Sequence, residues 1–468
     1  MHTGTIIAIN NSVATVRFTS GMPRLHELLE TEGTPPVRLE TISAISQTDY
    51  HCLVLDAAVD LVMGESVHAT SLTLQMPVGK AILGRAFNVF GEPIDGKKIG
   101  KTEKRSLYAT TSIDFSQVEP PNTILPTGIK AIDFFSPLLR GGKMALVGGA
   151  GVGKTILLTE LINNTIIRAQ KNAKKAPEKS EREPVAVFSA VGERSREAQE
   201  LIESLRDADV LQKTTLVVGQ MGENPAIRWR AAAAGTTIAE YFRDQGQDVL
   251  FFMDNIYRFA QAGYELSTLL NRLPSEDGYQ PSIPSEIGEL QERLTSTSQA
   301  SITSIQALYV PSDDLTDYGV RSIIPHIDSI VVLSREIYQA GLLPAVNVLE
   351  SSSAALSPEI AGERHYNLYL QSKDILERAK QIERIVSLVG VAELSAEDRT
   401  VYQRSLLLQN YMTQRFTVAS SQTGEPGMYI PLATVLADVE KILSGELDAI
   451  DPKQLLYCKR ITATSDSL

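Results

Sequence analysis

The sequence is poor in cysteine and lacks long apolar runs. Only 2 of its 468 residues are cysteine, Cys52 and Cys458, and they lie far apart without CxxC spacing. This excludes a disulfide framework and a cysteine-based zinc site. No apolar run reaches the roughly 18 residues that a membrane-spanning helix needs. We therefore expect a reducing compartment, and any association with a membrane through partner chains.

A surplus of positive charge is also missing. The chain has 44 Lys and Arg against 56 Asp and Glu, a net charge of −12. Proteins that wrap a nucleic-acid backbone need a basic face, so no nucleic-acid partner is expected. With 43% hydrophobic and 21% charged residues the composition is that of a globular protein. The length indicates about three domains, at about 150 residues each.

Short β-rich runs dominate the first part of the chain. In Thr5–Ile9 and Val13–Phe18 apolar side chains alternate with others, and an Asn-Asn-Ser turn lies between the two runs. Alternation with a period of two is typical of strands with one buried face. We therefore predict a small N-terminal β-barrel over residues 1–76.

The middle of the chain, residues 77–360, has a different pattern. Apolar, β-branched runs alternate with helical patterns, which predicts a mostly parallel sheet with helices on both faces. The expected strands are Met144–Val147, Val185–Ala190, Leu216–Val218, Val249–Met253, Ile302–Leu308 and Ile327–Leu333.

Residues 361–468 are expected to form a helical domain. Apolar residues recur at helical spacing from Ile375 to Val389, Gly390 is a stop signal, and Ser395 begins a capping-box pattern for a second helix. Between a predicted helix and a predicted strand, the polar run KNAKKAPEKSERE at 171–183 is expected to be a solvated loop. A docking patch for an acidic partner is the alternative.

One motif indicates a specific chemistry. The segment GGAGVGKT fits the phosphate-binding pattern GxxxxGK[ST], between an apolar strand and a helical pattern. Glycines let backbone N–H groups wrap a phosphate at a helix N-terminus. Lys154 is expected to reach the β- and γ-phosphates, and Thr155 to bind Mg²⁺. The predicted loop consists of Gly148, Gly149, Ala150, Gly151, Val152, Gly153, Lys154 and Thr155.

Charged residues follow two other predicted strands. Asp254 ends the run Val249–Met253 and is expected to hold Mg²⁺ through water; an acidic helix cap after a buried strand is the alternative. Glu193 and Arg194 follow Val185–Ala190, at the edge where open α/β sheets bind ligands. Phosphoryl transfer to water needs a carboxylate that orients the water and a positive charge near the γ-phosphate. These two residues offer both, although a charge cluster at a helix start is the simpler interpretation.

Taken together, the motifs resemble the catalytic beta subunit of F-type ATP synthases. GGAGVGKT, VGERSRE, FFMDNIYRFAQAG, RLPSEDGYQPSIPSEIGELQERLTST, SITSIQALYVPSDDLTD and AELSAED occur in the family's order, and the resemblance covers essentially the whole chain. It implies a multidomain α/β protein: an N-terminal β-barrel, a central RecA-like phosphate-loop domain and a C-terminal helical domain. It also implies an enzyme that makes or hydrolyses MgATP, with ATP, ADP and phosphate as substrates.

The resemblance also implies roles for single residues. By matching positions, Glu193 orients the attacking water and Arg194 contacts the γ-phosphate. Glu197 and Asp254 are implied to bind Mg²⁺-associated water, with Arg258 behind them in the catalytic set. Lys154 and Thr155 keep the roles that the phosphate-loop pattern gives them.

The implied partners are the other chains of a rotary complex. An alpha-like subunit would alternate with this chain in a hexameric ring and supply an arginine finger. A central gamma-like rotor, a peripheral stalk and a membrane sector complete the set. The rotor would meet the AELSAED segment, in which Ala392 and Ala396 replace family carboxylates, a change that we expect to be tolerated. Because no transit-type segment precedes the barrel, we expect a peripheral location on the cytoplasmic side of a bacterial plasma membrane.

The sequence departs from the family where the adenine ring is held. Leu343 stands in place of a tyrosine and Gln422 in place of a second aromatic residue, whereas Phe416 and Ala419 match the pattern. Stacking on a base is worth about 1–3 kcal/mol, so its loss weakens nucleotide binding by about ten- to a hundredfold. We expect looser selection for adenine, unless another residue packs the ring.

Two alternatives to a rotary ATP synthase subunit stay open. One is an F-type-like ATPase subunit with a different mechanical task, and the other is a structural subunit that holds ATP without turning it over. A hexameric secretion or RNA-translocating ATPase is disfavoured, because the chain has the rotor-contact segment and an acidic balance.

Overall fold

The computed structural model describes residues 2–56, 61–108, 115–149, 151–175, 184–275, 277–310, 316–420 and 424–461. Two compact units make up the chain. The first unit comprises Met1–Glu119 and Arg182–His326, and the second comprises Pro120–Glu181 and Ile327–Leu468. Each unit therefore combines segments that lie far apart in the sequence. The boundaries predicted at residues 76 and 360 stay predictions.

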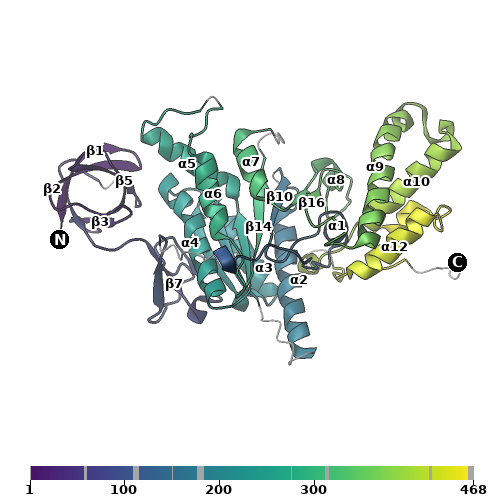
Figure 1. Ribbon diagram of the computed structural model, residues 1–468, viewed down its shortest axis with the longest axis horizontal. Helices are drawn as coiled ribbons and strands as arrows, with labels where there is room; N and C mark the ends of the chain where they lie inside the picture. Colours follow the sequence, from purple (N-terminus) through teal and green to yellow (C-terminus); the bar gives the residue numbers. More distant parts are fainter. Residues whose placement is uncertain are drawn as a thin grey trace. The chain divides into compact units, whose positions relative to one another are not determined.

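A closed barrel forms the N-terminal part of the first unit, which confirms the expected barrel (Figure 1). Its core includes Val16, Phe18 and Leu39, all buried. The tight turn between the first two strands places Asn11 at a φ of 51°, a conformation that asparagine tolerates. In their order around the barrel the strands are β1 (Thr3–Asn10), β2 (Val13–Ser20), β5 (Asp49–Val54), β4 (Arg38–Ala44), β3 (Leu28–Thr31) and β6 (Ser66–Ala69).

A parallel sheet occupies the rest of the first unit. Its strands lie in the order β14 (Ile302–Tyr309), β13 (Val249–Asp254), β11 (Val185–Glu193), β12 (Thr214–Gln220) and β8 (Ala86–Phe87). All residues of β11 are buried, and this burial on both faces explains the unbroken apolar run in its sequence. A separate antiparallel ribbon pairs β7 (Gln75–Val78) with β9 (Glu103–Ser106).

Helices pack on this sheet, and α4 approaches strand β11 closely. Opposite Gly235 of α4, an added Cβ would lie 2.7 Å from the Cβ of Ser189 in β11, so only glycine permits the close approach. The helices of the first unit are α3 (Ser195–Asp207), α4 (Pro225–Asp244), α5 (Ile256–Leu269), α6 (Ile283–Arg293) and α7 (Tyr318–Ile323), with 3₁₀ turns η2 (Lys80–Ile82), η3 (Phe115–Gln117), η4 (Leu211–Lys213) and η6 (Ile324–His326).

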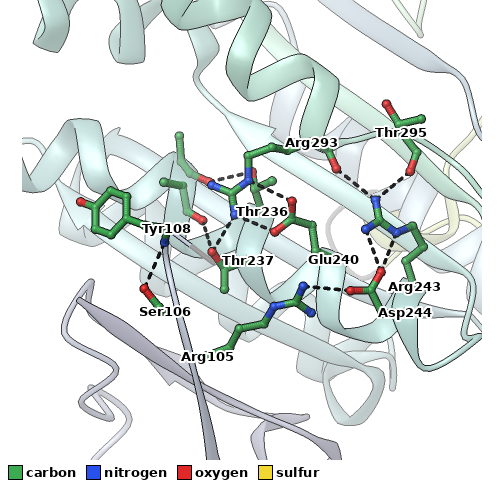
Figure 2. A network of polar contacts seen from close by, with 12 residues as sticks. Arg105, Ser106, Tyr108, Thr236, Thr237, Glu240, Arg243, Asp244, Arg293 and Thr295 are labelled. Carbon is green, nitrogen blue, oxygen red and sulfur yellow. Dashed lines mark hydrogen bonds and ion pairs between the residues drawn. The ribbon is translucent and has the colours of Figure 1, made fainter. Parts of the chain in front are cut away.

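Ion pairs fix the C-terminal half of α4 (Figure 2). Arg293, the last residue of α6, donates to both carboxylate oxygens of Glu240 at 2.9 and 2.6 Å. Arg243 donates to one oxygen of Asp244 and Arg105 of β9 to the other, at 2.7 and 2.9 Å. Because each carboxylate is matched by a guanidinium, this network holds α4, α6 and β9 together rather than presenting charge to a ligand.

The second unit contains the strand that leads into the phosphate loop. There β10 (Lys143–Gly148) pairs in parallel with β15 (Ser329–Val332), and β16 (Ser352–Ser353) adds an antiparallel edge. The short helices α1 (Lys130–Phe135) and α8 (Arg335–Gln339) belong to this unit.

The long helix α2 (Lys154–Lys175) corrects one prediction. We expected a loop over 171–183, but its first residues continue the helix. Lysine and alanine favour helices, and the first breaker in the run is Pro177. Residues 176–183 lie outside the described residues.

The C-terminal helices of the second unit follow the predicted pattern. Figure 1 shows α9 (Glu363–Val389) and α10 (Ala396–Tyr411) packed side by side. As predicted, α9 ends at Gly390, whose φ is 86°. The Ser395 hydroxyl accepts a hydrogen bond from the Asp398 N–H at 3.1 Å, which confirms the cap of α10. The remaining elements are α12 (Leu432–Ser444) and the 3₁₀ turns η7 (Val391–Glu393), η8 (Thr417–Ala419) and η9 (Pro452–Leu455).

Within the described part of the chain, every helix is too short or too polar to cross a membrane.

Candidate nucleotide-binding site

The phosphate loop of the second unit depends on glycine. Gly151 and Gly153 have φ values of 77° and 89°, in the left-handed region that glycine adopts without strain. At Gly148 an added Cβ would lie 2.9 Å from the carbonyl oxygen of Leu333, the residue after β15. The loop is thus a close-packed backbone turn, as the motif predicts. Ala150 lies outside the described residues.

Lys154 and Thr155 begin α2 directly after this loop. The Lys154 ammonium donates to the carbonyl oxygens of Gly148 and Gly149 at 2.5 and 2.8 Å, so its charge lies on the loop itself. Thr155 is exposed, whereas Val152 is buried beneath the turn. A helix N-terminus with a lysine beside it attracts anions, and this arrangement suits a phosphate.

The predicted base-binding residues also belong to the second unit. The side chain of Leu343 is 40% exposed, and its backbone N–H donates to the hydroxyl of Tyr457 at 3.4 Å. Phe416 precedes the turn η8, and Ala419 ends it. An aromatic residue that the sequence did not single out, Tyr457, therefore lies beside Leu343. Gln422 lies outside the described residues.

In the first unit, a bulge turns Glu193 at the end of β11. The register between β11 and β12 shifts between Val191 and Glu193, and Gly192 has a φ of 69°. Bulges of this kind redirect a side chain where pairing ends. The result is a Glu193 side chain at the strand end that is largely buried, with 8% of the residue exposed.

Carboxyl groups gather around Glu193 with a single guanidinium in contact. Arg258 lies 3.4 Å from Glu193 and also donates to the Gly192 carbonyl. Burial raises the pKa of Glu193 to about 9, and a hydrogen bond with Glu197 and the charge of Asp254 add to the effect. The same hydrogen bond lowers the pKa of Glu197. Glu193 therefore carries the proton of this pair at neutral pH.

Unlike Arg258, Arg194 has a side chain that is mostly exposed to solvent. Its side chain is 64% exposed and lies 3.8 Å from Glu197, three residues along the same helix start. The first unit thus brings together Glu193, Glu197, Asp254 and Arg258, with Arg194 at the solvent side. This is a carboxyl cluster able to exchange a proton, beside an exposed positive charge.

The donor chemistry fits a magnesium ion that arrives with phosphates. Among the described residues, no group of three or more His, Cys, Asp and Glu side chains is placed to hold a metal ion. Mg²⁺ usually keeps several waters and binds through one or two protein ligands plus substrate phosphates. The exposed Thr155 hydroxyl and the Asp254 carboxylate are ligands of that kind.

Three further residues belong to these surroundings, and the sequence motifs assign a role to none of them. Gly192 produces the bulge, Tyr457 contacts the Leu343 backbone, and Glu160 is buried in α2 behind the phosphate loop. A glycine immediately before a strand-end carboxylate was an available signal for the first. The other two depend on partners distant in the sequence.

A parallel-sheet α/β chain with a glycine phosphate loop and strand-end carboxylates is a phosphate-loop nucleotide-binding protein. Residues 128–353 match the ATP synthase alpha/beta family nucleotide-binding domain, and residues 355–454 match the C-terminal domain of V and A type ATP synthase. ATP synthase subunit beta 2 of Nitrosomonas eutropha is 45% identical over 442 residues, which cover 94% of this chain and 88% of that one. The chain belongs to the ATP synthase alpha/beta family.

Proposed function

We propose that this chain uses its phosphate loop and its strand-end carboxyl cluster on one MgATP, as the catalytic beta subunit of a rotary ATP synthase. The chain is a divergent beta subunit, which makes or hydrolyses ATP. The observation that supports the proposal is that the chain has both a glycine-rich phosphate loop in its second unit and, in its first, Glu193, a carboxyl of raised pKa at a parallel strand end. Similarity to an ATP synthase beta subunit over nearly the whole chain supports the proposal that the phosphate loop and the carboxyl cluster act on the same nucleotide.

The phosphate end of the nucleotide belongs to the loop. Backbone N–H groups of residues 148–153 and the N-terminus of α2 bind the phosphate oxygens, and Lys154 neutralises their charge. Thr155 holds the magnesium ion that neutralises the phosphates, with Glu197 and Asp254 acting on its water shell. The Thr155 hydroxyl is exposed at the helix start, where such a ligand is needed.

Glu193 orients the water that attacks the γ-phosphate. Burial and the neighbouring carboxyl groups raise its pKa to about 9 in the chain without Mg²⁺, and the positive charge of a bound Mg²⁺ would favour the ionised carboxylate that accepts the proton of the water. Arg258 holds the carboxyl in place at 3.4 Å. Arg194, exposed beside it, meets the charge on the γ-phosphate. In synthesis the same groups act in reverse on ADP and phosphate.

The partners are the other subunits of the complex. An alpha-like subunit alternates with this chain in a hexameric ring, and a gamma-like rotor turns against the segment Ala392–Asp398. Just before that segment, Leu388 near the end of α9 is 85% exposed and Val391 at the start of η7 is 41% exposed, which supports a contact with another chain. A peripheral stalk and a membrane sector join the ring to the membrane. The match to a bacterial chain supports a place at the cytoplasmic face of the plasma membrane.

Replacing the acid–base residue tests catalysis. In the assembled complex, Glu193→Gln is expected to lower ATP turnover by about a hundredfold or more, because the amide cannot take the proton. Glu200→Gln is the matched control: this side chain lies on the same helix α3, is 59% exposed and pairs with Arg196. Assembly and nucleotide binding are measured alongside. Unchanged turnover in the Glu193 variant would instead favour a structural subunit that only holds ATP.

A comparison of ATP with GTP as substrate tests the effect of Leu343, which stands where the family has a tyrosine. Losing about 1–3 kcal/mol of stacking weakens the binding of either base, and we infer that the looser pocket discriminates ATP from GTP by less than about tenfold in kcat/KM. The measurement compares both nucleotides in the assembled complex. A preference for ATP above about a hundredfold contradicts the inference. In that case Tyr457→Leu shows whether the ring beside Leu343 packs on the base.

A further inference from the structure

A buried carboxyl in α2 belongs neither to the phosphate-loop motif nor to the strand-end carboxyl cluster. Glu160 is in the second turn of the helix, after Lys154 and Thr155, and none of it is exposed. Burial raises its pKa above the usual value. Burying a carboxyl is costly unless hydrogen bonds compensate, so its partners indicate why it is there.

One partner is Asn164 of α2, whose side chain hydrogen-bonds to Glu160, and the others are on the turn η8. A carboxylate oxygen of Glu160 accepts a hydrogen bond from the Val418 N–H at 3.0 Å. The amide and the hydroxyl of Thr417 also donate to it. Thr417 and Val418 are the first residues of η8, and the residue before them, Phe416, provides no side-chain cap. Glu160 therefore satisfies N–H groups that a helical turn leaves without a partner at its start.

This contact joins two ends of one ligand site. One end of α2 is the phosphate loop, and η8 is flanked by Phe416 and ends at Ala419, the proposed base-binding residues. The helix is rigid, so the carboxyl sets the distance between the segment that meets the base and the loop that meets the phosphates. Both elements lie in the second unit.

We propose that Glu160 is a positioning residue for the nucleotide base, which it serves by capping η8 from the phosphate-loop helix. The inference rests on the proposed function, because it takes η8 to be the base-binding segment. A segment fixed before binding spares the nucleotide the entropic cost of ordering it. Without the cap, base binding weakens while phosphate binding at the loop is retained.

Two ligands separate the two ends in an experiment on the full chain. MgADP reaches both the loop and η8, whereas inorganic pyrophosphate reaches the loop alone. By titration calorimetry, Glu160→Ala is expected to weaken MgADP binding by about tenfold, the value of one charge-assisted hydrogen bond. Pyrophosphate binding stays within about twofold. Glu160→Gln, whose amide oxygen accepts the same N–H, recovers most of the loss.

Thr165→Val is the matched control in the same helix. Thr165 is buried, and its hydroxyl donates within α2 to the Leu161 carbonyl at 2.7 Å. Both affinities are expected to match those of the unchanged chain. If the Ala variant loses its fold, which circular dichroism detects, Glu160→Asp replaces it. Its shorter side chain withdraws the acceptor from η8, with the same selective loss expected.

The outcomes distinguish the two proposals. An unchanged chain that binds neither MgADP nor pyrophosphate contradicts the proposed function itself. If the unchanged chain binds both ligands but the Ala or Asp variant weakens them equally, Glu160 acts on the fold alone and the positioning role is wrong. Equal affinity of every variant for MgADP is the third contrary result.

Discussion

Glu40 and Glu193 are both buried in the first unit, but their charges are balanced in opposite ways. Glu40, in barrel strand β4, is 0% exposed and meets the Arg230 guanidinium of α4 through two hydrogen bonds, at 2.9 and 2.8 Å. Burial would raise the pKa of Glu40, but the charge of Arg230 and hydrogen bonds from His26 and Tyr108 outweigh it and lower the pKa.

At Glu193 the positive charge nearby does not offset the effect of burial, and the pKa of the carboxyl is raised. Its guanidinium partner, Arg258, lies 3.4 Å away and in a single contact. Burial, a hydrogen bond with Glu197 and the charge of Asp254 together raise the pKa of Glu193 to about 9. A matched pair therefore holds elements together, whereas an excess of carboxyl groups keeps a proton available for exchange. Such mismatches are typical of functional sites.

Breaking the matched pair is expected to have the largest effect. Arg230→Met leaves the Glu40 carboxylate buried without its guanidinium, which costs about 3–5 kcal/mol of the free energy of unfolding. Denaturant unfolding of the full chain measures the loss. At the mismatched site, Arg258→Met is expected to cost less than about 1 kcal/mol, because the carboxyl it faces is already protonated.

The double variant Glu40→Leu with Arg230→Met provides the control for this loss. With both charges gone and similar volume in place, stability is expected to return close to that of the unchanged chain. A single Arg230→Met variant as stable as the unchanged chain would remove the basis of the comparison.

The sequence predicted the elements that depend on local signals. Three features depend on residues that lie close together in the sequence. They are the turn glycines of the phosphate loop, the apolar run of β11 and the cap at Ser395. Local patterns set helix starts, tight turns and buried strands directly. For the same reason the loop expected at 171–175 was wrong, since polar residues with high helix propensity extend α2 there.

The sequence could not predict how the charges of Glu40 and Glu193 are balanced. Glu40 and Arg230 are 190 residues apart, and Glu160 and Val418 are 258 apart. Every such carboxylate looks the same in a sequence, because its pKa depends on burial and on partners that the fold supplies. Glu193 was found from its strand-end position, but the bulge at Gly192 and the hydrogen bond with Glu197 were not.

Removing the mismatch should stabilise the fold, and increasingly so as the pH rises. The folded chain holds the Glu193 proton up to a pKa of about 9, against an ordinary 4.5. The unfolded chain therefore binds fewer protons between these values, and the stability of the unchanged chain falls as pH rises through that window. Glu193→Gln cannot ionise, so its advantage in the free energy of unfolding should grow with pH, by at most about 1.4 kcal/mol for each pH unit inside that window. Denaturant unfolding from pH 5 to pH 9 without Mg²⁺ or nucleotide measures this gap, with Glu200→Gln as the flat reference. A gap that stays constant with pH would mean that Glu193 is ionised like an ordinary carboxyl, and that the two buried carboxylates do not differ as the structure indicates.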